Sequence, residues 1–214
     1  MKLTALLLVS LALGLTSCGK KQTLQEKQAE IEHGVIDASN QYTAAELGWT
    51  VGIPADWNVM TKKEKEKLTR QGLKSLEAAV GGDVDTSGLK ELLNLKKDNF
   101  NSFLSTIEAY DEAKDGPWKE QHANVVQLLE ESFAKSGVKT GKTIQGTEEI
   151  DGLEFQTAQI AVNHPSSGKV LMTLKMYSRL LHGFDFAMTC SWNNEKDQAT
   201  LEKVVRSSKF TFRD

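Results

Sequence analysis

The sequence predicts an α+β fold: an α/β/α sandwich in which a mainly antiparallel sheet of about seven strands is flanked by about three helices. Three observations support this prediction. Stretches of alternating apolar and polar residues follow one another in the C-terminal half, separated by short turn sequences. Segments with apolar residues at helical spacing lie between strand-like segments. A composition of 39% hydrophobic and 26% charged residues is typical of a packed domain.

The first strand is predicted over residues 47–53, shortly after the domain begins near Tyr42. Apolar residues alternate there with Gly and Thr, and Pro54 ends the pattern. Thr61 followed by Glu64 three residues later is a capping box, which predicts that a helix begins here. The helix continues to about Val80, where "GGDVDTSG" ends it.

Two short strands with a turn around residues 97–99 are predicted within "ELLNLKKDNFNSFLSTIEAY". A second helix begins at "DGPW", with Pro117 at its first position. Its apolar stripe contains Val125, Leu129 and Phe133, and Gly137 ends it.

Four strands then form an antiparallel meander over residues 142–192. Their turns are Asp151-Gly152, "PSSG" and His182-Gly183. In the last strand, "FDFAMTCSW", the large apolar residues and Cys190 face one way, while Asp185, Ala187, Thr189 and Ser191 face the other. A final helix begins at Asn194, buries Leu201, Val204 and Val205, and ends before "KFTFRD".

Residues 1–17 have the layout of a secretory signal peptide: a positive start at Lys2, then an apolar stretch, then small residues. "LTSC", residues 15–18, resembles the bacterial lipobox, in which the cysteine is acylated and becomes the first residue of the mature chain. Two alternatives are a chance cysteine after an ordinary signal peptide and a disulfide between Cys18 and Cys190. The lipobox interpretation predicts a membrane anchor at Cys18.

The polar stretch that follows predicts a tether over residues 18–41, which lifts a single domain, residues 42–214, off the membrane. The predicted location is the bacterial cell envelope. Gly19 follows the cysteine instead of the aspartate that retains lipoproteins in the inner membrane of enteric bacteria. The outer membrane is therefore the expected site.

Charge and motifs exclude several classes of function. The net charge is -3 and no basic stripe is present, so nucleic acid is not an expected partner. No G-x-S-x-G motif occurs, and the four histidines show no metal-ligand spacing. We therefore expect neither enzymatic activity nor a cofactor.

Two weak candidate sites remain. Asp83, Asp85 and Ser87 match the first half of a calcium loop, but position 12 would be Asn94 instead of glutamate, so a surface loop is the favoured interpretation. Trp57 follows Pro54 on a loop and could line a ligand cleft. The favoured interpretation of Trp57 is that it closes one edge of the core.

"GWTVGIPADW", with Tyr42 before it, resembles the opening of PsbP-like domains, a superfamily that also contains the Ran-binding Mog proteins and bacterial DcrB-type lipoproteins. The strands and last helix of "YSRLLHGFDFAMTCSW" and "LEKVVRSSKF" fit the same pattern, so the resemblance covers residues 42–212. It implies an antiparallel sheet flanked by helices and a non-catalytic, protein-binding domain, and it transfers no active-site residues. The expected function is a membrane-anchored adaptor or assembly factor; the alternative is a lipoprotein that binds a small molecule or calcium.

Overall fold

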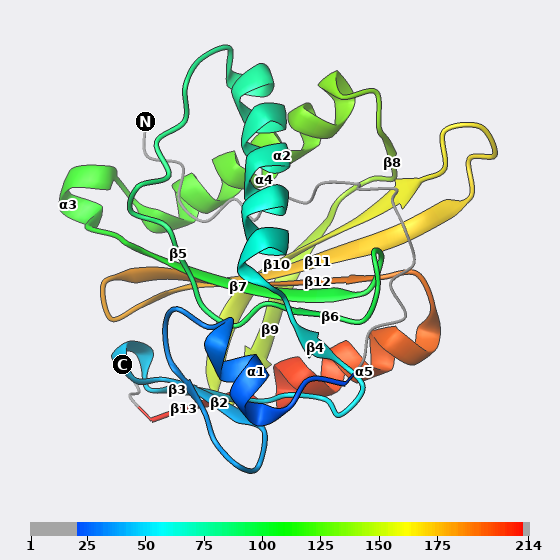
Figure 1. Cartoon of the computed structure of the whole chain (residues 1–214). Helices are drawn as coiled ribbons and strands as arrows, with labels where there is room; N and C mark the ends of the chain where they lie inside the picture. The colour runs from blue at the N-terminus through cyan, green and yellow to red at the C-terminus, as the bar shows by residue number, and fades with distance from the viewer. Residues whose placement is uncertain (1–20, 212–214) are drawn as a thin grey trace.

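The computed structural model describes residues 21–211. Within this range a nine-stranded antiparallel sheet forms the centre of the molecule (Figure 1). Its principal order is β4 (Asn58–Val59), β6 (Leu95–Lys96), β7 (Ser102–Ala109), β12 (Phe184–Trp192), β11 (Val170–Leu181), β10 (Leu153–Asn163) and β8 (Lys139–Thr140). β5 (Lys90–Glu91) pairs with β7, and β9 (Ile144–Ile150) pairs with β10. The predicted meander is confirmed as β9 to β12.

A second, four-stranded sheet covers one face of the central sheet together with α5 (Glu195–Arg206). Its strands are β1 (Val35–Ile36), β2 (Gln41–Ala44), β3 (Trp49–Gly52) and β13 (Lys209–Phe210). The larger apolar core lies between these two layers. Trp49 is at its centre, fully buried, with its ring 4.9 Å from that of Phe186.

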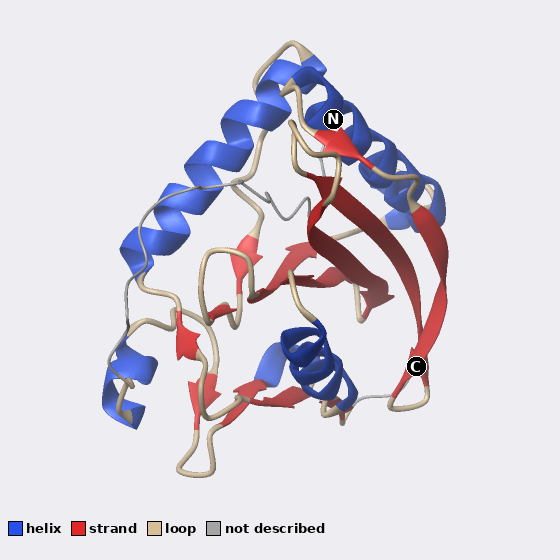
Figure 2. Ribbon diagram, turned by 90° about the vertical axis from the view of Figure 1, so that its right-hand side faces the viewer, coloured by secondary structure: helices blue, strands red, loops and turns tan. Residues whose placement is uncertain are grey.

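The opposite face is covered by α2 (Lys62–Val80) and α4 (Trp118–Lys135), with the short α3 (Glu112–Asp115) before α4. A smaller core of aliphatic residues and Phe133 lies between the two long helices and β10 and β11. Figure 2 shows α2 and α4 meeting above the central sheet, with α5 below it. The predicted α+β sandwich is confirmed, but its lower layer also contains a second sheet.

Short sequence motifs predicted the ends of several helices and strands correctly. Thr61 and Glu64 form the predicted capping box at the start of α2. At the turn between β11 and β12 both central residues, His182 and Gly183, have positive φ values of 51° and 77°, as a two-residue hairpin turn of the favoured type requires. Pro117 differs slightly from the prediction, because it is the N-cap residue of α4 and helical residues begin at Trp118.

The N-terminal segment corrects the predicted polar tether. Residues 22–41 are folded: α1 (Leu24–Ala29) begins with a capping box formed by Thr23 and Glu26, and β1 pairs with β2. Ile31 and Ile36 are buried in the larger core. The folded domain therefore includes the chain from Gln22 onward, because buried apolar residues and side-chain hydrogen bonds hold this mainly polar segment against it.

Gly34 provides a direct test of this packing. Its φ is +88°, and a Cβ there would lie 2.5 Å from the Tyr42 hydroxyl oxygen and 2.6 Å from the Thr43 carbonyl oxygen. We expect Gly34→Ala to lower the free energy of unfolding more than Gly81→Ala, measured by urea denaturation. Gly81 is a matched control because its φ is also positive, at +73°, but its Cβ would meet nothing within 4 Å. The left-handed backbone alone costs about 1–2 kcal/mol, so equal losses in the two variants would contradict tight packing at Gly34.

Candidate functional site

Two carboxylates lie side by side beneath α4. Glu108 on β7 and Asp185 on β12 are direct partners in the antiparallel register, and their exposed fractions are only 4% and 6%. Strand alternation places them on the face opposite to Phe186, which packs in the larger core. Two buried acids in such proximity cannot both ionise at low cost, so at least one of them binds a proton more tightly than usual.

Asp185 is the member of the pair whose pKa is raised. Burial raises the pKa of Asp185 from its ordinary value of 3.8 to about 7; the hydrogen bond from Trp118 opposes this rise, and the charge of Glu108 adds to it. The Trp118 Nε1–H donates to Asp185 Oδ1 over 2.9 Å. The pair can therefore take up or release one proton near neutral pH.

Helix α4 and the loop after α2 both cover this acidic pair. The imidazole of His122 stacks on the Trp118 ring at a centroid distance of 5.4 Å, and burial lowers the pKa of His122, which keeps the ring neutral at pH 7. Gly88, in the loop after α2, approaches from the other side: a Cβ there would be 3.1 Å from Glu108 Oε1. A glycine at this position thus allows the loop to cover the carboxylate.

Two threonine hydroxyls lie on the same face of the sheet. Thr106 and Thr189 are each 2% exposed, and their Oγ1 atoms form no hydrogen bond with any residue in the described range 21–211. With the acidic pair they make the middle of this sheet face polar, between apolar packing against α4 and a small contact of Met60 and Leu104. This face of the sheet therefore contains two threonine hydroxyls without a hydrogen-bond partner in the described residues and a carboxyl pair that can exchange a proton.

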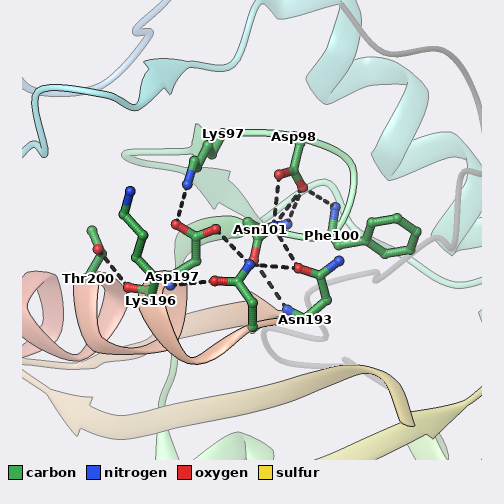
Figure 3. Close-up of polar contacts among 9 residues, drawn as sticks. Lys97, Asp98, Phe100, Asn101, Asn193, Lys196, Asp197 and Thr200 are labelled. Carbon is green, nitrogen blue, oxygen red and sulfur yellow. Dashed lines mark hydrogen bonds and ion pairs between the residues drawn. The ribbon is translucent and has the colours of Figure 1, made fainter. Parts of the chain in front are cut away.

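A second polar cluster joins the β6–β7 turn to the beginning of α5 (Figure 3). Asn101, which is 1% exposed, donates from Nδ2 to Asn193 Oδ1 over 3.1 Å and accepts from the Asn193 backbone N–H over 3.2 Å. Lys97 Nζ lies 2.6 Å from Asp197 Oδ1. Burial opposes ionisation of Asp197, but the hydrogen bonds from Lys97 and Asn194 outweigh it, and the pKa of Asp197 is lowered. These contacts fasten two elements together.

The structure separates the residues that sequence analysis proposed as sites. Trp57 is 2% exposed and packs in the larger core. Asp83, Asp85 and Ser87 are exposed, and Asp85 Oδ1 accepts the Ser87 backbone N–H over 2.9 Å, which is a local turn. Over residues 21–211 no three His, Cys, Asp or Glu side chains are grouped so that they could hold a metal ion. Cys18 lies outside the described residues.

Glu108 and Asp185 could not be recognised as a pair from the sequence. Alternation predicts that Asp185 shares a face with Thr189, but no sequence pattern indicates that β7 places Glu108 opposite it. The only available signal was an aspartate within an apolar strand.

Cys190 is buried, and burial raises the pKa of its thiol, so it is a core residue. None of the helices in the described part of the chain combines the length and apolar character of a membrane span.

Comparisons with known proteins identify the fold. No protein-family model matches the chain, and no curated protein matches it in sequence. The solution structure of cyanobacterial PsbP (CyanoP) from Synechocystis sp. PCC 6803 is similar, with a TM-score of 0.53 and 10% identity over 83% of this chain and 96% of that one. A crystal structure from Bacteroides thetaiotaomicron VPI-5482 gives 0.42 and 10% identity over 78% of this chain and 46% of that one. The first of these similarities shows the fold predicted by the resemblance.

Proposed function

We propose that this chain, whose fold is PsbP-like, is a lipid-anchored protein of the bacterial envelope that binds another protein as an adaptor or assembly factor. The observation that carries the anchor is the sequence "LTSC", residues 15–18, placed directly after a signal-like apolar stretch. An acylated Cys18 would confine the domain to one membrane surface. Confinement raises its effective concentration for a partner in the same layer.

The exposed edge of the central sheet supports protein binding. Among residues 21–211, β9 pairs with β10 alone, and six of its seven residues are not buried. Ile144, at its start, is 65% exposed. An edge strand presents backbone N–H and C=O groups that an extended segment of a partner can pair with. We therefore place the protein-binding surface at β9.

A crosslinked pull-down from native membranes tests this function. We expect one specific protein to co-purify with the full chain and to be lost from a Cys18→Ala variant, which should also leave the membrane fraction. A chain that is recovered alone would contradict the adaptor function and favour the alternative, a ligand-binding lipoprotein. A Cys18→Ala variant that stays in the membrane fraction would contradict the anchor.

A variant of β9 tests the surface separately from the anchor. Hydrogen-bonded pairs alternate along an antiparallel hairpin, so counting from the turn at Asp151 directs the Thr147 N–H away from β10. Thr147→Pro removes that outward donor and no bond to β10. The expected result is membrane-bound protein without its partner, whereas Thr147→Ser should retain the partner.

A further inference from the structure

The chain is fixed to the domain at Gln22, immediately after the first described residue. The Gln22 side chain forms two hydrogen bonds with one residue of β4: the Val59 N–H donates to Oε1 over 2.7 Å, and Nε2 donates to the Val59 carbonyl over 3.0 Å. The Gln22 backbone N–H also donates to Asn58 Oδ1 over 3.4 Å. An amide held at both ends has little freedom to move away from β4.

The helix that follows is fixed as well. Lys27 of α1 is 5% exposed and donates to Asn40 Oδ1 over 2.8 Å. Glu30, the C-cap residue, accepts from the Lys62 backbone N–H over 2.7 Å and from Lys65 Nζ over 3.0 Å. α1 is thus attached to both the β2 side of the domain and the beginning of α2, and it moves with the domain.

This attachment limits the distance between the domain and an anchor at Cys18. Gln22 is four residues beyond Cys18. Four residues span at most about 14 Å when fully extended, which is about twice the thickness of the polar headgroup region on one side of a bilayer, about 5–8 Å. Resting on the proposed function, in which Cys18 carries lipid, we propose that the α1 end of the domain lies directly on the bilayer surface.

The residues around Gln22 suit such a surface. Leu24, the first residue of α1, is an apolar residue that is 40% exposed within the described residues 21–211. Lys21, Lys62 and Lys63 are exposed nearby, and Lys21 lies 3.3 Å from Asp56. An apolar side chain can enter the interface while lysines meet lipid phosphates. The acidic Glu26 is engaged in the α1 capping box, where its Oε2 accepts the Thr23 N–H.

The opposite end of the domain is far from this surface. α2 begins beside Glu30 and contains 19 residues, so it is about 28 Å long from end to end. In both views α1 lies at the lower end of the molecule and the C-terminal end of α2 at the upper end (Figures 1 and 2). A probe at each end therefore reports which one faces the lipid.

The experiment uses the full chain, lipidated in a bacterial host and reconstituted into vesicles of phosphatidylcholine and phosphatidylglycerol with nitroxide-labelled headgroups. Single cysteines replace Gln25 on α1 and Ala78 on α2, both exposed, and carry a fluorophore. Cys190 is buried and does not compete for the label. We expect quenching to be several-fold stronger in Gln25→Cys than in Ala78→Cys. A long Gly/Ser spacer inserted between Lys21 and Gln22 should abolish the difference.

Flotation of the vesicles separates the possible failures. A chain that floats but shows equal quenching at the two positions overturns the orientation and leaves the lipid anchor intact. A chain that does not float overturns the proposed anchor, and the orientation with it, because nothing then holds α1 at the bilayer. Stronger quenching at Ala78 than at Gln25 would place the bilayer on the opposite end.

Discussion

Replacing Asp185 with asparagine is expected to increase the free energy of unfolding at pH 8 by up to about 4 kcal/mol, because a pKa of about 7 in the folded state compares with an ordinary 3.8. The raised pKa means that the folded state binds the proton more tightly than the unfolded chain. Stability of the wild type therefore falls as the pH rises from about 4 to about 7 and is constant above that. Asparagine is neutral throughout and can still accept from Trp118.

Urea denaturation followed by tryptophan fluorescence at pH 8 and pH 4 measures this difference. The gain in the Asp185→Asn variant should be large at the higher pH and close to zero at the lower. Asp83→Asn is the matched control, since Asp83 is exposed, and its free energy of unfolding should follow that of the wild type at both pH values. Parallel curves for the Asp185→Asn variant and the wild type would mean that folding leaves the pKa of Asp185 unchanged.

The part of the fold that could be predicted depends on local patterns. The meander β9 to β12 was recognised because its strands alternate over many residues and its turns contain dipeptides such as Asp151-Gly152. The start of α2 was recognised because Thr61 and Glu64 satisfy each other's backbone groups within a single turn. Such signals need no knowledge of the rest of the molecule.

The second sheet and the packing of α1 against the domain could not be predicted in this way. β13 has two residues, and it pairs with β3 from the other end of the chain, Lys209 opposite Thr50. A strand of two residues has no period, and its existence depends on packing against Trp49 and its neighbours. α1 is mainly polar, so its place in the fold depends on contacts such as Lys27 with Asn40.

The acidic pair was missed for a related reason. Strand alternation states which residues share a face, but the opposing residue on a neighbouring strand depends on the register between β7 and β12. That register joins segments far apart in sequence, and it brings Glu108 opposite Asp185. Only the tertiary structure then shows that Trp118 covers them.

Replacing Trp57 with alanine is expected to lower the free energy of unfolding by about 3–5 kcal/mol, as for other buried aromatic residues. Trp57 is 2% exposed and belongs to the larger core, and its backbone N–H donates to the Pro54 carbonyl over 3.2 Å. A tryptophan that served mainly to bind a ligand would contribute little to the stability of the free protein. Urea denaturation without any ligand therefore distinguishes the two interpretations.

Trp57→Phe serves as the second variant, because the alanine variant could lose most of a typical stability of about 5–15 kcal/mol and fail to fold. Phenylalanine keeps much of the buried apolar area, so a smaller loss, about 0.5–3 kcal/mol, is expected. Unchanged stability in both variants would contradict the core role.

Trp57 also lies next to the attachment point of the N-terminal segment, because Asn58 and Val59, which bind Gln22, directly follow it in the chain.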